Sequence, residues 1–371
     1  MSLFVVAGEK SGDAIGAKVL APLSKQFSIE GVIGPKLKEI GAKELFSIDS
    51  FGVMGFVDVL KSLPRFIFLF HKIKKTILKK NPKVVLLIDN AEFSLLLAKS
   101  LRKKGFKGKI AQLVSPSVWA WRSSRIKILE KNFDILLSIL PFEKSYFTAS
   151  SLRVEYVGHP LIDELKDYKP QNEVCFLGDK PIIALFPGSR KKETCLNLTL
   201  QLKALKNITS HQIAISVASK KILPLIEKIL KESNLEATLV FPENRFELMQ
   251  KADFALSKLG TVNLELAFFN VPTITTFPLP KIEEFLLSRV FKVFLPHYSL
   301  VNLLARRRVF PEYVGSFAKL DHVEREIKNF CTAKELKEWS IAGCNLVKKI
   351  LEEHSFSSKS SHILTNLLLD I

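Results

Sequence analysis

Short apolar runs that alternate with helix-type patterns constrain the fold of this chain more than any other feature. Strand-type runs occur at Leu3–Ala7, Val84–Ile88 and Ile110–Val114, and apolar residues follow helical spacing in Ala14–Lys25 and Ala91–Lys104. Uninterrupted apolar runs between helices are typical of parallel strands that are covered on both faces. The pattern therefore predicts repeated βαβ units on a parallel sheet.

The same alternation begins again at Pro181 and predicts a second α/β domain. A polar segment that contains Pro170 and Gly178 separates the two series, and its composition is that of an interdomain linker. We expect a Rossmann-like domain over residues 1–170, a second one over 171–345, and a helical segment over 346–371 that packs back on the first domain. Two such doubly wound domains would face each other across a cleft and bind ligands at the carboxyl ends of their strands.

Composition limits the classes of partner. The chain has 55 Lys and Arg against 37 Asp and Glu, a net charge of +18, which favours phosphorylated substrates or an anionic membrane surface. No nucleic-acid-binding motif is present.

The four cysteines lack disulfide-framework or zinc spacing, so we expect a reducing compartment and no metal. No apolar stretch reaches the roughly 20 residues of a membrane span, and the first residues do not resemble a secretory signal. We therefore expect a cytoplasmic protein.

Two turns at predicted strand ends are candidate sites in the first domain. The turn Gly8–Asp13 combines glycines with a helix start, which suits either anion binding or a plain turn in which Ser11 or Asp13 caps the helix. Asp89 follows the strand Val84–Ile88. A carboxylate there takes a proton from an attacking hydroxyl or caps the next helix. Both alternatives remain open at both turns.

The loop Ser115–Arg122 follows another predicted strand and concentrates aromatic residues. It contains Trp119, Trp121 and Arg122, residue types that form walls for a sugar or a phosphate. A packed structural loop is the alternative. His159 has no evident partner nearby in the sequence, and we expect it to be structural.

The second domain repeats the pattern of polar residues after apolar strands. Ser189 and Arg190 follow the strand Ile182–Phe186 and suit phosphate contact. Gly260 and Thr261 open a helix whose N-terminus would hold a diphosphate. Glu265 lies one helical turn further on the same face, where it would bind ribose hydroxyls.

The segment Leu60–Lys80 has apolar residues at helical spacing, and Pro64 suits its start. It is either an amphipathic core helix or an interfacial helix. The interfacial interpretation assigns membrane contact to Phe66, Phe68, Leu69 and Lys72.

Together these segments resemble the lipid-A-disaccharide synthase family of inverting glycosyltransferases, which have the GT-B architecture. The resemblance covers nearly the whole chain. Its most specific motifs are Ser115–Arg122 and Leu140–Lys144, and others follow in the same order: Ala7–Glu9, Val53–Leu60, Gly158–Pro160, Pro187–Arg190, Gly260–Glu265 and Ser299–Ala305. The chain departs from the family pattern at three places: Asn90–Glu92, Lys258–Leu259 and Val301.

The resemblance implies a reaction of lipid A biosynthesis. UDP-2,3-diacylglucosamine and 2,3-diacylglucosamine 1-phosphate would give a β-1,6-linked disaccharide and UDP, without a metal or another cofactor, at the inner face of the cytoplasmic membrane. Asp89 would be the general base, and the acceptor side would include Glu9, Ser11, Trp119 and Arg122. The donor nucleotide would be held by Ser189, Arg190, Gly260, Thr261, Glu265 and Asn302. Another UDP-sugar enzyme of this architecture, such as an epimerase or a lipid-linked glycosyltransferase, and a non-catalytic membrane-surface protein remain alternatives. The oligomeric state stays open.

Overall fold

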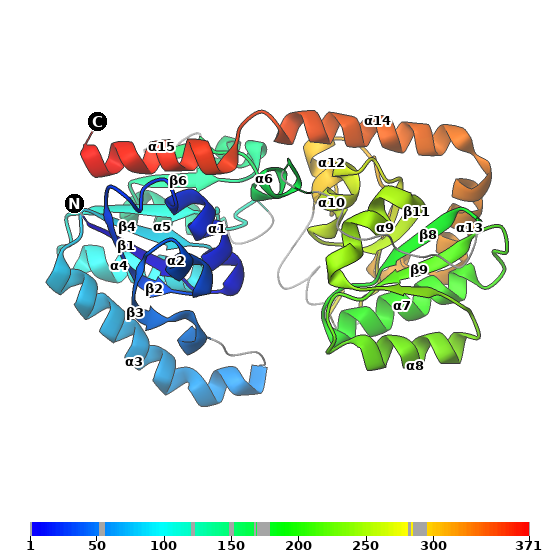
Figure 1. Ribbon diagram of the computed structural model, residues 1–371, viewed down its shortest axis with the longest axis horizontal. Helices are drawn as coiled ribbons and strands as arrows, with labels where there is room; N and C mark the ends of the chain where they lie inside the picture. Colours follow the sequence, from blue (N-terminus) through cyan, green and yellow to red (C-terminus); the bar gives the residue numbers. More distant parts are fainter. Residues whose placement is uncertain are drawn as a thin grey trace. The chain divides into compact units, whose positions relative to one another are not determined.

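The computed structural model describes residues 2–51, 56–119, 123–147, 152–166, 168, 179–280, 283–284 and 295–370. They form two compact units (Figure 1). The first unit comprises residues 1–166 and 351–371, and the second comprises residues 167–350. The chain thus leaves the first unit slightly before residue 170 and returns to it shortly after residue 346.

The first unit is built on a seven-stranded parallel sheet in the order β3-β2-β1-β4-β5-β6-β7. Its strands are β1 (Ser2–Ala7), β2 (Ser28–Ile33), β3 (Lys43–Ser47), β4 (Val84–Ile88), β5 (Lys109–Leu113), β6 (Ile135–Ser138) and β7 (Arg153–Tyr156). Every residue of β4 is buried, as in a strand covered on both faces. β1 lies beside β4 with Ala7 opposite Ile88. The strand order reverses between these two strands, and such a switch point is where doubly wound sheets bind ligands.

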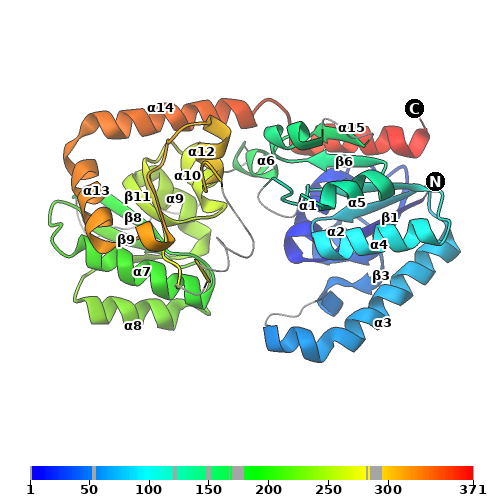
Figure 2. The same cartoon turned by 180° about the vertical axis from the view of Figure 1, so that it is seen from behind.

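The helices of the first unit include the C-terminal one. They are α1 (Lys10–Leu20), α2 (Pro35–Glu39), α3 (Phe56–Lys80), α4 (Ala91–Lys103), α5 (Arg125–Asn132), α6 (Pro160–Lys166) and α15 (Phe356–Leu369), with short 3-10 turns η1 (Ile48–Phe51) and η2 (Pro141–Phe147). Helix α15 packs on α1, where the Ser361 hydroxyl donates a 2.5 Å hydrogen bond to the Val19 carbonyl. Phe356 at its start is fully buried. The last helix is therefore part of the first core, as Figure 2 shows from behind.

The second unit has a six-stranded parallel sheet in the order β10-β9-β8-β11-β12-β13. Its strands are β8 (Ile182–Phe186), β9 (Gln212–Ser216), β10 (Thr238–Val240), β11 (Ala252–Lys258), β12 (Thr273–Phe277) and β13 (Glu312–Val314). Its helices are α7 (Lys191–Leu205), α8 (Leu223–Ser233), α9 (Arg245–Lys251), α10 (Val262–Phe268), α12 (Leu300–Ala305), α13 (Leu320–Thr332) and α14 (Lys334–Leu351), with 3-10 turns η3 (Pro242–Asn244) and η5 (Gly315–Phe317). Here the strand order reverses between β8 and β11.

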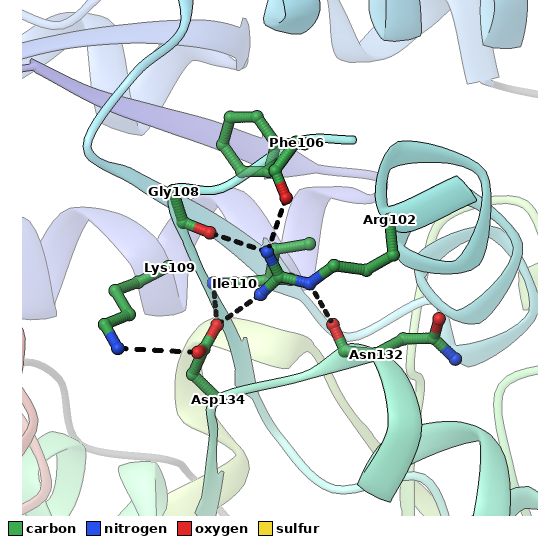
Figure 3. Close-up of polar contacts among 7 residues, drawn as sticks. All are labelled: Arg102, Phe106, Gly108, Lys109, Ile110, Asn132 and Asp134. Carbon is green, nitrogen blue, oxygen red and sulfur yellow. Dashed lines mark hydrogen bonds and ion pairs between the residues drawn. The ribbon is translucent and has the colours of Figure 1, made fainter. Parts of the chain in front are cut away.

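A polar cluster holds the amino ends of β5 and β6 together (Figure 3). The Arg102 guanidinium, near the end of α4, donates hydrogen bonds to the carbonyls of Phe106 (2.8 Å), Gly108 (2.9 Å) and Asn132 (3.2 Å). It also pairs with the Asp134 carboxylate, which accepts a 2.7 Å hydrogen bond from the Ile110 amide. The cluster fixes two strands from the edge of the sheet opposite to their carboxyl ends.

Helix α3 differs in two respects from the sequence prediction. It begins at Phe56, so Pro64 lies inside the helix and does not start it, because the helical pattern continues on the N-terminal side of the proline. Phe66 and Leu69 face the core: the Phe66 ring packs edge-on against Phe93, and Leu69 is only 8% exposed. Of the apolar residues expected to meet a membrane, only Phe68 is strongly exposed, at 68%.

Candidate functional site

The turns after β1 and β4 touch each other at the switch point of the first sheet. A Cβ atom on Gly8 would lie 2.8 Å from the Asn90 side-chain nitrogen, so a larger residue at position 8 would displace the Asn90 side chain. Asp89 (φ 53°) and Asn90 (φ 40°) both adopt left-handed backbone conformations. The sequence left open whether Asp89 caps the next helix. Asn90 is the N-cap residue of α4, so Asp89 does not cap it. The carboxylate of Asp89 is thus available for other chemistry, and its role as a base stays a prediction.

Backbone strain continues at the end of β5. Val114 has φ 71°, a backbone conformation that is rare for a β-branched residue. Residues in such strained conformations cluster at functional sites. The buried Gln112 amide donates 3.1 Å hydrogen bonds to the carbonyls of both Asp89 and Val114. This side chain ties the two strained turns together, and sequence reasoning missed it because nothing in its local pattern marks it.

The turn Gly8–Asp13 is fixed by a different contact from the one expected. Helix α1 begins at Lys10 with Glu9 as its N-cap residue, and neither Asp13 nor Ser11 caps it. Asp13 is buried and caps α2 instead, accepting hydrogen bonds from the amides of Gly34 (2.9 Å), Lys36 (2.8 Å) and Leu37 (3.2 Å). Glu9 and Ser11 remain exposed beside the Asp89 turn.

Trp119 is half-buried, and its ring packs edge-on against Phe142 at 5.3 Å. Next to it lies Glu143, whose burial raises the pKa to about 8, an effect that the Leu140 amide, the Trp119 indole and the Ser138 hydroxyl partly offset. The Glu143 carboxyl is therefore largely protonated at pH 7. Arg122, the other residue expected on this wall, lies outside the described residues.

His159 is buried, and its burial lowers the pKa to about 4. Its Nδ1 accepts a 3.2 Å hydrogen bond from the Leu161 amide at the start of α6. A neutral ring that accepts a backbone hydrogen bond agrees with the structural role expected from the sequence.

The second sheet carries a cavity of about 340 Å³ at its switch point. The turns after β8 and β11 form two of its walls, and residues beyond β9 and β10 complete it. Four residues that the sequence predicted to bind nucleotide line this cavity: Ser189, Gly260, Thr261 and Glu265. We call it the second-unit cavity.

Two ion pairs line the second-unit cavity. Arg245 Nε lies 3.3 Å from Glu265 Oε2, and Lys258 Nζ lies 3.3 Å from Glu193 Oε2. From the sequence, no binding role was assigned to Arg245, Lys258 or Glu193; Lys258, just before the Gly260 turn, was noted only as a departure from the family pattern. Among the residues that the structure describes, no group of three or more His, Cys, Asp or Glu side chains could hold a metal ion.

The two remaining nucleotide candidates lie outside this cavity. Arg190 is 80% exposed at the start of α7 and pairs with Glu193 at 3.1 Å. Asn302 is fully buried, and its amide oxygen accepts 2.8 Å hydrogen bonds from the amides of Val309 and Phe310. Its amide nitrogen donates to the Phe310 carbonyl at 2.8 Å. The Asn302 side chain therefore stabilises the segment between α12 and β13.

Comparison with known proteins assigns the family. Residues 3–366 match the model of a family described as lipid-A-disaccharide synthetase. The chain belongs to this family. The lipid-A-disaccharide synthase of Chlamydia pneumoniae is 39% identical over 372 residues, which cover 96% of this chain and 61% of the relative. That of Thiobacillus denitrificans is 31% identical and covers 87% of this chain and 88% of the relative. The chain thus spans about three fifths of the length of the chlamydial relatives.

Solved structures confirm the predicted fold class. A UDP-N-acetylglucosamine 2-epimerase of Neisseria meningitidis, solved with UDP-GlcNAc, matches with a TM-score of 0.61 at 12% identity and covers the whole of both chains. A putative epimerase of the same kind from Listeria monocytogenes matches with a TM-score of 0.61 at 14% identity, over 98% of this chain and 94% of the other. The structural likeness shows that this chain has the GT-B fold. At such low identity it shows the fold alone.

Proposed function

We propose that this chain is an inverting glycosyltransferase of lipid A biosynthesis. It would condense UDP-2,3-diacylglucosamine with 2,3-diacylglucosamine 1-phosphate to give the β-1,6-linked disaccharide 1-phosphate and UDP. One observation carries the proposal: in a chain of this family, four residues predicted to bind nucleotide line one cavity at the switch point of the second sheet.

The second-unit cavity suits a nucleoside diphosphate. Its volume of about 340 Å³ lies in the range of small-molecule sites. The hydroxyls of Ser189 and Thr261 supply donors for phosphate oxygens, whereas the Gly260 amide already donates a 3.2 Å hydrogen bond to Asn263 Oδ1. The Glu265 carboxylate supplies acceptors for ribose hydroxyls. The cavity lies wholly within the second unit, so donor binding is expected to be independent of Asp89.

Asp89 would act as the general base for the acceptor 6-hydroxyl. Its turn lies against Gly8, which keeps Glu9 and Ser11 of the next turn beside it for acceptor contacts. As the acceptor oxygen bonds to the anomeric carbon from the face opposite to UDP, its proton passes to Asp89. The bond to the β-phosphate breaks, and its electron pair leaves with UDP. Attack from that face inverts the anomeric centre.

Helix α3 supports membrane association through one exposed face. Phe68, Lys72, Lys75 and Lys79 are all exposed and recur every three or four residues, so they form a single stripe. Neighbouring Ile67 is 49% exposed. A stripe that combines an aromatic residue with lysines suits the surface of an anionic bilayer. No helix in the described ranges is long and apolar enough to cross a bilayer.

The direct test incubates the protein with both lipid substrates and measures disaccharide and UDP. Absence of product with authenticated substrates would overturn the proposal, and consumption of a UDP-sugar without an acceptor would indicate an epimerase instead. Asp89→Asn should lower turnover by about 10²- to 10⁴-fold, the range of general-base catalysis. Its affinity for UDP and its urea unfolding midpoint should stay unchanged, and the midpoint separates loss of the base from loss of the fold of the first unit.

A further inference from the structure

The Lys258 side chain lies between the two glycine turns of the second-unit cavity. Its Cγ is 3.6 Å from the position that a Cβ atom on Gly188 would occupy, and its Nζ is 3.7 Å from the corresponding position on Gly260. The Nζ also lies 5.2 Å from the centre of the Phe277 ring, a cation–π contact that supports the ammonium group. Because both turns lack a side chain at these points, the ammonium group borders the space that the turns enclose.

The charged groups that line the cavity form two ion pairs whose charges sum to zero: Lys258 with Glu193, and Arg245 with Glu265. Glu193 Oε2 lies as close to the Cβ position of Gly188 as Lys258 Cγ does, at 3.6 Å. Glu193 also pairs with Arg190 (3.1 Å), which lies outside the cavity. Because Arg190 provides a second partner for Glu193, the Lys258 ammonium group can pair with an anion in the cavity while Glu193 stays paired.

We propose that Lys258 binds the diphosphate of the sugar donor and stabilises the negative charge that develops on it as the sugar leaves. This inference rests on the proposed function. When the bond between the anomeric carbon and the β-phosphate oxygen breaks, the electron pair moves to that oxygen while the acceptor proton moves to Asp89. A fixed cation beside the leaving oxygen lowers the free energy of this step. The step consumes no further reactant.

A purely structural role for Lys258 makes different predictions. In that case the pair with Glu193 only fastens α7 to the end of β11, and removing the charge would affect stability but not the preference among nucleotides. Lys258→Met separates the two roles, because methionine keeps an unbranched apolar stem against Phe277 and loses the ammonium group. Lys258→Arg restores the charge. Lys206→Met, at an exposed lysine beyond the end of α7, is the matched control.

The first measurement is calorimetric binding of UDP and UMP to the full-length chain. Loss of a charge-assisted contact should weaken UDP binding of Lys258→Met by about 10- to 100-fold. UMP lacks the β-phosphate, so its affinity should fall by no more than about 3-fold. Lys258→Arg should recover most of the UDP affinity, and Lys206→Met should match the unmodified chain. Unchanged UDP affinity in Lys258→Met, or an equal loss for UDP and UMP, would overturn the inference.

The second measurement is turnover of the two lipid substrates. A cation that acts on the leaving group should influence the transition state, so Lys258→Met should lower kcat by about 100-fold in addition to raising KM. A change in KM alone would contradict the catalytic part of the inference. If the unmodified chain neither binds UDP nor forms disaccharide, the proposed function itself fails. If it does both and Lys258→Met behaves identically, only the role of Lys258 fails.

Discussion

Replacing Glu143 by glutamine removes a buried carboxyl group whose titration makes the free energy of unfolding depend on pH. The pKa of Glu143 rises from 4.5 to about 8, chiefly because burial penalises the charged form. Between these two values the native chain holds a proton that the unfolded chain has released. Stability should therefore fall as pH rises, by about 1.4 kcal/mol per pH unit, and the full span corresponds to about 5 kcal/mol.

His159 produces the opposite slope over part of the same range. Its pKa is lowered from 6.5 to about 4 by burial, so stability is lost as pH falls through that interval because the unfolded chain takes up the proton first. The two effects nearly cancel between about pH 4.5 and 6.5. A stability profile of the unmodified chain would therefore look flat in that window and decline only above it.

The comparison with Glu143→Gln isolates the carboxyl group. Glutamine keeps an oxygen that can accept the Leu140 amide hydrogen bond and has no charge to bury. The variant should be more stable by about 3 kcal/mol at pH 7, the cost that the carboxyl group accumulates between pH 4.5 and 7. Urea unfolding at pH 5, 6, 7 and 8, followed by tryptophan fluorescence, measures the difference. Parallel profiles for the two proteins would show that Glu143 titrates normally, and the reasoning would be refuted.

Two further predictions concern the first unit. Serine at both Ile67 and Phe68 should lower the partition coefficient for phosphatidylglycerol vesicles, measured by sedimentation, by about 10²- to 10⁴-fold, since burial of each large apolar side chain contributes about 1.5–3 kcal/mol; serine at exposed Phe317, in the second unit, is the control. Equal sedimentation of the double variant would remove α3 from the proposed contact. Arg102→Met should lower the free energy of unfolding by about 3 kcal/mol, because it removes the donor of three part-buried carbonyl hydrogen bonds and one of the partners of the Asp134 carboxylate; a urea midpoint within error of the unmodified chain would contradict this.

Sequence patterns identified the central strands because those strands are uniformly apolar. The bounds of β4 and β8 agree with the predicted runs Val84–Ile88 and Ile182–Phe186. Among the edge strands, β10 lies within the predicted run Ala237–Phe241. The edge strands β3 and β13 were not predicted, since they are short or partly polar: β3 begins with exposed Lys43 and Glu44, and β13 has three residues. A strand with one neighbour needs fewer apolar residues, and its pattern then resembles a loop.

The residues of the candidate site also fall into two groups, those that could be placed from the sequence and those that could not. Residues fixed by a strand, turn and helix in direct succession, such as Gly260, Thr261 and Glu265, could be placed from sequence, because parallel strands bring their carboxyl ends to one edge. The pair of Lys258 with Glu193 could not, because the two residues are far apart in the sequence and meet only when β8 and β11 become neighbours. Asn302 was assigned to the donor site only by the family resemblance. Its buried amide makes hydrogen bonds to the backbone of Val309 and Phe310, and its contact with the donor stays a prediction.

The two sheets differ in charge at the same topological position. At the first switch point, the strained turns carry half-buried Asp89 and exposed Glu9; at the second, the cavity is lined by the cations Lys258 and Arg245, each paired with a carboxylate. Glycosyl transfer of the proposed kind needs both, since a proton must leave the attacking hydroxyl while negative charge accumulates on the departing diphosphate. A carboxylate placed among the cations of the second unit would be stabilised as an anion and would be a weaker base. In the proposed mechanism, a base on one sheet and cations on the other each keep their strength.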